Sequence, residues 1–134
     1  MVLPQRAPAA EQFSVVPPVL AASATRYQRL RAIEKEHLAL MARHNLLDDW
    51  SPEVTETVLT AREHIQQARD ARDVFRGQVW TFVVTLREAG EPLTAALRHV
   101  RSMLVLLENC GALSPDGGWL EAEILEWAIE EYES

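Results

Sequence analysis

The chain has 134 residues, of which 48% are hydrophobic and 25% are charged; these values are typical of a soluble globular protein with a single core. Its formal net charge of −7 opposes direct binding to nucleic acid or to anionic lipid, because both partners would be negative. The single cysteine, Cys110, excludes an internal disulfide and a cysteine-based zinc site, which fits a reducing, cytoplasmic location.

Residues 1–22 contain four prolines, whose fixed φ angle and missing amide hydrogen disfavour helices and central strands. We therefore expect an extended or disordered tail. It lacks the continuous apolar core of a signal peptide, and the chain has no apolar run of the roughly 18 to 20 residues that span a bilayer. Five apolar residues of the tail are suited to docking on the chain itself or on a partner: Phe13, Val15, Val16, Val19 and Leu20.

A first helix is predicted over about residues 25–45, with Ser23 or Thr25 as its capping residue. Its inward residues recur every three or four positions, as one face of a helix requires. They are Tyr27, Leu30, Ile33, His37, Leu40 or Met41, and His44. Residues 48–50 are expected to connect this helix to the next one.

A long second helix is predicted over about residues 52–89, because Ser51 can cap it and Pro52 needs no amide hydrogen at the first helical position. Its apolar residues alternate spacings of four and three, which is typical of coiled-coil packing. This seam consists of Val54, Val58, Ala61, Ile65, Ala68, Arg72, Phe75, Val79, Phe82 and Leu86. Gly77 is the point where such a helix would kink or break.

Two features of the second helix indicate an interface. Arg72 occupies a seam position, so its charge must find a carboxylate or reach water along the side-chain stem. Trp80, Val83 and Val84 lie off the seam and give the helix a second apolar face. That face needs either another helix of the same bundle or a partner at an interface, where tryptophan is favoured.

Gly90 ends the second helix and Pro92 opens a third, predicted over about residues 92–110 with Gly111 as its cap. Its inward residues are Leu93, Ala96, Leu97, Val100, Met103, Leu104 and Leu107. A last helix is predicted over about residues 119–132. Its apolar face is Leu120, Ile124, Leu125, Trp127, Ala128 and Ile129.

The pattern as a whole predicts an all-α protein, a four-helix bundle-like single domain over residues 23–134. The first helix carries five basic and two acidic residues, whereas residues 119–134 carry six glutamates and no basic residue. These opposite charges suit contact within one chain or contact between chains.

The segment from Leu86 to Tyr132 resembles a group of short uncharacterised all-helical proteins of high-GC bacteria. The resemblance rests on the Gly90-x-Pro92 turn, the Leu- and Val-rich helix that follows, and the sequence Trp-Ala-Ile-Glu from Trp127. The pattern has a second proline and a lysine where this chain has Leu93 and Arg101. It covers about a third of the chain and implies no activity.

Histidines raise the question of a metal site. Glu34 and His37 have the Glu-x-x-His spacing of di-iron bundles, which need this pair twice, but Ala61 stands three residues before His64. His44 lies two turns beyond His37, too far to share one metal ion with it unless a side chain from another helix joins them. We therefore expect no metal and no other cofactor.

His99 is the candidate phosphoacceptor of a histidine phosphotransfer-like signalling domain, which is also a small helical bundle. Ser102 and Met103 stand where that family has a basic and a small residue. Cys110 lies in the last turn of a helix, where the dipole disfavours a thiolate, and we expect it to be at least partly buried. No arrangement indicates a small-molecule substrate, so we do not expect an enzyme.

We therefore predict a non-enzymatic interaction or regulatory module that binds a protein partner or a second copy of itself through the long second helix. The alternatives are the phosphotransfer domain and an acidic mimic of nucleic acid that occupies a basic protein. The candidate interface residues are Arg72, Trp80, Val83, Val84, Glu123, Glu126 and Glu130.

Overall fold

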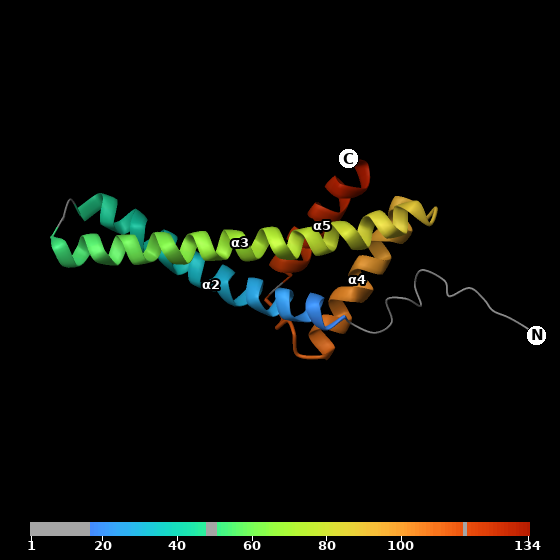
Figure 1. Cartoon of the computed structure of the whole chain (residues 1–134), viewed down its shortest axis with the longest axis horizontal. Helices are drawn as coiled ribbons and strands as arrows, with labels where there is room; N and C mark the ends of the chain where they lie inside the picture. The colour runs from blue at the N-terminus through green and yellow to red at the C-terminus, as the bar shows by residue number, and fades with distance from the viewer. Residues whose placement is uncertain (1–16, 48–50, 117) are drawn as a thin grey trace, which may run out of the picture.

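The computed structural model describes residues 17–47, 51–116 and 118–134, and within these ranges the chain forms four α-helices and no strand (Figure 1). They are α2 (Pro18–Leu47), α3 (Pro52–Glu88), α4 (Leu93–Asn109) and α5 (Trp119–Glu133). The all-α, bundle-like prediction is confirmed, and α3, α4 and α5 begin and end within one residue of their expected bounds. None of these described helices is long and apolar enough to cross a membrane.

The start of α2 differs from the prediction. It begins at Pro18, because a proline in the first turn loses no hydrogen bond and its φ angle already suits a helix. The amide of Ala21 donates to the carbonyl oxygen of Pro17 at 3.0 Å. Leu20 is buried in the core, so the end of the segment predicted as tail belongs to the helix. Val19, in the same turn, is exposed, and the remaining apolar tail positions, Phe13, Val15 and Val16, lie outside the described residues.

The two predicted caps of α2 instead connect it to the rest of the chain. The hydroxyl of Ser23 donates to Oε1 of Gln78 on α3 at 2.5 Å. The hydroxyl of Thr25 donates to the carbonyl oxygen of Ala112, beyond α4, at 2.7 Å. Both polar groups therefore fix the packing of α2.

The helix α3 runs through Gly77 without a break. Ser51 caps it, since its Oγ accepts a hydrogen bond from the amide of Val54 at 3.3 Å. The predicted seam is buried at Val58, Ala61, Ile65, Ala68, Phe75, Val79, Phe82 and Leu86. Arg72 keeps 41% of its side chain exposed, with Nε 3.8 Å from Oδ1 of Asp73. It therefore reaches water from within the seam, as a long cationic side chain can.

Glycines end α3 and α4 as predicted. Gly90 and Gly111 have φ angles of +88° and +81°, which side chains with a Cβ rarely adopt. After α3, the amide of Glu91 donates to the carbonyl oxygen of Leu86 at 3.1 Å, and the same pattern follows α4. These are Schellman turns, which satisfy carbonyl groups that the helix leaves free.

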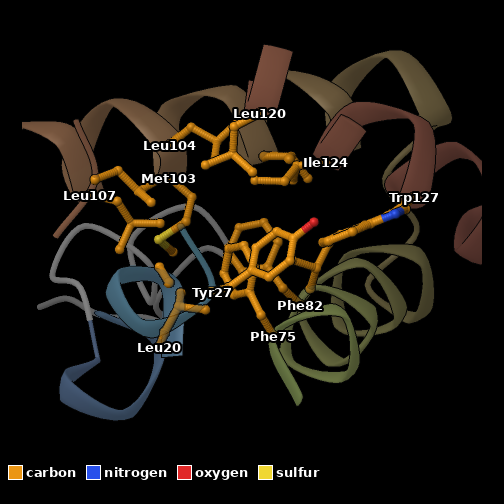
Figure 2. Packing of buried hydrophobic residues seen from close by; sticks show 14 of the residues in the cluster. Leu20, Tyr27, Phe75, Phe82, Met103, Leu104, Leu107, Leu120, Ile124 and Trp127 are labelled. Carbon is orange, nitrogen blue, oxygen red and sulfur yellow. The ribbon is translucent and has the colours of Figure 1, made fainter. Parts of the chain in front are cut away.

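The core lies where the first half of α2, the second half of α3, and both short helices meet (Figure 2). Three rings from α2, α3 and α5 form its centre. The ring centroids of Tyr27 and Phe75 are 5.8 Å apart, those of Tyr27 and Trp127 5.7 Å, and those of Phe75 and Trp127 6.0 Å. The surrounding apolar side chains include Met103, Leu104, Leu107, Leu120 and Ile124.

At the other end of the molecule, α2 and α3 are the only helices among the described residues (Figure 1). We call this antiparallel pair, residues 34–47 and 52–67, the arm. Val58, Ala61 and Ile65 are buried in it, yet they are not part of the main core cluster. The arm is therefore held by one seam between two helices.

Val83, a candidate interface residue whose face could also pack within the bundle, is fully buried in the core. Two predicted side-chain positions are wrong. Cys110 is exposed, because it follows the last inward residue of α4 and the chain turns away at Gly111. Ile129 is 36% exposed, since Trp127 and Ala128 already fill the inward face of that turn.

Phe75→Ala should lower the free energy of unfolding by about 3–5 kcal/mol, because it removes a ring from the centre of the core and leaves a cavity. Leu59→Ala is the matched control on the same helix, since Leu59 is 54% exposed and its loss should cost less than about 0.5 kcal/mol. Urea denaturation followed by circular dichroism measures both. Similar losses in the two variants would contradict this placement of the core.

Candidate interaction surfaces

An uncharged strip lies on α3 on the side away from the core. This α3 outer strip consists of Val74, Gly77, Trp80, Thr81 and Val84, whose spacings of three and four residues place them on one helix face. Val74 is 57% exposed and Trp80 is 46% exposed. Val84 is half-buried, while Gly77 and Thr81 are exposed. The described chain therefore leaves Val74 and Trp80 of the strip largely uncovered and covers part of Val84.

The predicted second face of α3 is thus divided between the core and the surface. Successive residues of a helix point about 100° apart, so Val83 and Val84 cannot share one environment on a half-buried helix. Val83 packs inside, while Trp80 stays accessible. Of the predicted apolar interface residues, Trp80 and Val84 remain available to a partner.

Arginines of α3 contact the acidic face of α5. Nη2 of Arg76 lies 2.7 Å from Oε2 of Glu130, and its Nε lies 3.3 Å from Oε1 of Glu131. The hydrogen bond to Glu130 is the main cause that raises the pKa of Arg76. The guanidinium also lies 5.7 Å from the ring centroid of Trp127, within cation–π range. Glu130, a predicted interface residue, is therefore already paired within the chain.

A second polar cluster joins α2 to α5. The hydroxyl of Tyr27 donates to Oε1 of Glu123, and Nε of Arg31 lies 3.8 Å from the same oxygen. Nη1 of Arg31 also lies 3.2 Å from Oδ2 of Asp116. The Asp116 carboxylate in turn accepts a hydrogen bond from the amide of Leu120 and so caps the start of α5. The sequence did not indicate this cluster, because its members lie far apart along the chain.

A third set of contacts also joins α5 to α3 and α4. Nη1 of Arg87 donates to the carbonyl oxygens of Glu131, Tyr132 and Ser134 at 3.3, 3.1 and 3.0 Å, which satisfies groups at the helix end. Nε of Arg101 lies 3.1 Å from Oε1 of Glu121. Most glutamates on the acidic face of α5 therefore already contact arginines of the same chain. Among the described residues, the predicted interface residue Glu126 has no ion-pair partner and is exposed.

Clefts lie on the described surface of these helices. One, of about 340 Å³, lies between the end of α4 and the start of α5, where apolar side chains and four charged ones line it, the charged ones being Arg101, Glu108, Asp116 and Glu121. Another is an apolar groove of about 250 Å³ between the start of α2, α3 and α4. Its lining includes Val19, Leu20, Phe82 and Met103.

His99, the predicted phosphoacceptor, lies on α4 with 23% of its side chain exposed. Its Nε2 is 3.9 Å from Oε1 of Glu91. Met103, four residues later, is buried in the core. A carboxylate beside the ring repels an incoming phosphoryl group, so this environment favours a histidine that pairs with Glu91.

Two other histidines meet across the arm. Nδ1 of His64 on α3 lies 2.8 Å from Nε2 of His37 on α2, and the ring centroids are 4.7 Å apart. The sequence analysis did not pair them, because it compared spacings within single helices. The described residues contain no group of three or more histidine, cysteine or acidic side chains that could hold a metal ion. The side chain of His44 lies outside the described part.

A scan against protein-family models and searches of curated proteins and of solved structures find no match to this chain. The resemblance noted for Leu86–Tyr132 therefore stays a prediction.

The pairing of Tyr27 with Glu123 predicts a loss of stability in alkali. Burial, followed by the hydrogen bond to Glu123, raises the pKa of Tyr27 well above its ordinary value of 10.0. The unfolded chain can then release this proton above pH 10 while the folded chain keeps it. Its contribution to stability is complete below about pH 10 and falls as the pH rises, by up to about 1.4 kcal/mol per pH unit.

Urea denaturation between pH 9 and pH 11.5 measures this slope. Tyr27→Phe should largely remove the loss, whereas the control Tyr132→Phe, at the other tyrosine, should retain it. An unchanged slope in Tyr27→Phe would show that another group causes the alkaline loss.

Proposed function

We propose that this protein is a non-enzymatic helical interaction module that forms a homodimer through the α3 outer strip. The observation that carries the proposal is the exposure of Val74 and Trp80 on a strip without a charged side chain. Large apolar side chains in water carry a free-energy cost, which a matching apolar surface relieves. A second copy of the chain supplies such a surface.

The shape of the strip also supports close contact between two helices. Gly77 lies near its middle, and a Cβ built on this glycine would have no atom within 4 Å. The open space admits a large side chain from a partner. An antiparallel arrangement around a twofold axis sets Trp80 of each copy over Gly77 of the other. Tryptophan is among the side chains that contribute most to such interfaces.

The two alternative functions have weaker support. Phosphotransfer requires an accessible histidine that tolerates added negative charge, whereas His99 is mostly covered and lies beside Glu91. An acidic mimic requires carboxylates that are free to meet a basic partner. Here Glu121, Glu123 and Glu130 already contact arginines of the same chain.

Light scattering should report a mass of about twice 15.1 kDa at high micromolar concentration. Trp80→Glu should weaken the dimer at least about 30-fold, because it removes a central apolar side chain worth about 2 kcal/mol or more and adds a charge. Trp119→Glu is the matched control, since Trp119 is 69% exposed at the start of α5, outside the strip. A glutamate there also suits the helix dipole.

Circular dichroism should show that both variants keep their helices. A monomeric wild-type chain, or a dimer that survives Trp80→Glu unchanged, would refute the proposal.

A further inference from the structure

The arm brings two imidazoles from separate helices into contact through one nitrogen of each ring. His37 and His64 lie on α2 and α3, and both side chains are half-buried. Their facing nitrogens, Nε2 of His37 and Nδ1 of His64, are 2.8 Å apart. The helix backbones hold the two residues opposite each other, and among the described helices only α2 and α3 form this part of the molecule.

The separation of the two nitrogens is close to that required by a shared metal ion. Imidazole nitrogens bind zinc at about 2.0–2.1 Å, so two ligands at a tetrahedral angle stand about 3.3 Å apart. A small rotation of the two rings, which opens the contact by about half an ångström, therefore makes room for the ion. Neither helix has to move as a whole.

The protonation of the pair is also compatible with metal binding. In the neutral contact, one of the two facing nitrogens carries the hydrogen and the other accepts it. Transfer of that hydrogen to the second nitrogen of the same ring leaves a lone pair on each facing nitrogen, and the ring rotation described above turns both toward a shared ion. The relocated N–H lies on a half-buried ring and can bond to water, one of the usual partners of the outer nitrogen in metal-bound histidines.

We propose that His37 and His64 form a two-histidine site for a late first-row transition-metal ion, such as Zn²⁺ or Cu²⁺, that connects α2 to α3 within the arm. Imidazole is a preferred ligand of these ions. Water completes the coordination. Glu34, one turn before His37 on the same helix face, adds negative charge, although Nε of Arg69 lies 3.8 Å from its Oε2. The site lies outside the α3 outer strip and does not depend on the homodimer.

Metal binding at this site should change the local stability of the arm. The arm is held by a single seam, whereas the ion adds a direct connection between its two helices. A ligand that binds only the folded chain stabilises it in proportion to its concentration above the dissociation constant. The ion should therefore stabilise the arm against local opening more than the four-helix end of the molecule.

The test titrates the tag-free full chain with ZnCl₂, and separately with CuSO₄, in a non-coordinating buffer at pH 7.5. One ion should bind per chain. Loss of a partner outside the coordination sphere already weakens metal sites roughly 10- to 100-fold, so His37→Gln and His64→Gln should each lower the affinity at least about tenfold. His99→Gln is the control and should bind like wild type.

Two further readouts distinguish the site from a general effect on folding. The electron paramagnetic resonance spectrum of the Cu²⁺ complex should show coupling to two imidazole nitrogens, and either arm variant should remove this signature. Zn²⁺ should raise the melting temperature of wild type and not that of His64→Gln, with circular dichroism confirming that the variant is helical. Absence of saturable binding below about 1 mM, or equal affinity in wild type and His64→Gln, would overturn the proposal. Light scattering with a chelator present tests the homodimer separately.

Discussion

The difference in length between α3 and the two short helices, α4 and α5, limits how much of α3 each of them can contact. At 1.5 Å per residue, the 37 residues of α3 extend about 55 Å. The 17 residues of α4 and the 15 residues of α5 span less than half of that distance. Both short helices lie against the same end of the α2–α3 hairpin, where the rings of Tyr27, Phe75 and Trp127 pack together. The rest of the hairpin is the arm.

Electrostatic pairing fixes α5 on this long hairpin. A helix with six glutamates and no basic residue is unfavourable alone, because like charges repel and the negative end of the dipole adds to the repulsion. Arginines from every other described helix meet it: Arg31 from α2, Arg76 and Arg87 from α3, and Arg101 from α4. The exposed pairs contribute little to stability individually. The partly buried contacts of Arg31 and Arg87 fix the orientation of the helix.

Much of the fold follows from local patterns in the sequence. The apolar spacing along α3 identifies its buried seam, and the turn formed by Gly90 and Pro92 marks the boundary with α4, because both signals depend on neighbouring residues alone. The start of α2 is harder to predict. Two prolines in a row usually indicate a break, yet Pro18 is the first residue of the helix. Whether the helix begins at Pro18 or later depends on whether the following turn is buried. Leu20 in that turn is buried only by contacts in the assembled core.

The candidate sites depend on contacts between helices, which periodicity does not specify. Spacing shows that α3 has apolar residues on two sides, but the packing of the other helices decides that Val83 is covered and Trp80 is not. In the same way, the register between α2 and α3 brings His64 to His37. The pairing of Tyr27 with Glu123 joins residues 96 positions apart, and no local pattern indicates it.

Native-state hydrogen exchange along α3 tests the division into core and arm most directly. The account predicts that amides of residues 58–66 exchange through local opening at a lower free energy than global unfolding. Amides of residues 71–86, which lie over the main core, should exchange only when the whole chain unfolds. Equal protection along the full length of α3 would contradict the account, because the arm would then be as stable as the part of α3 that packs against α2, α4 and α5.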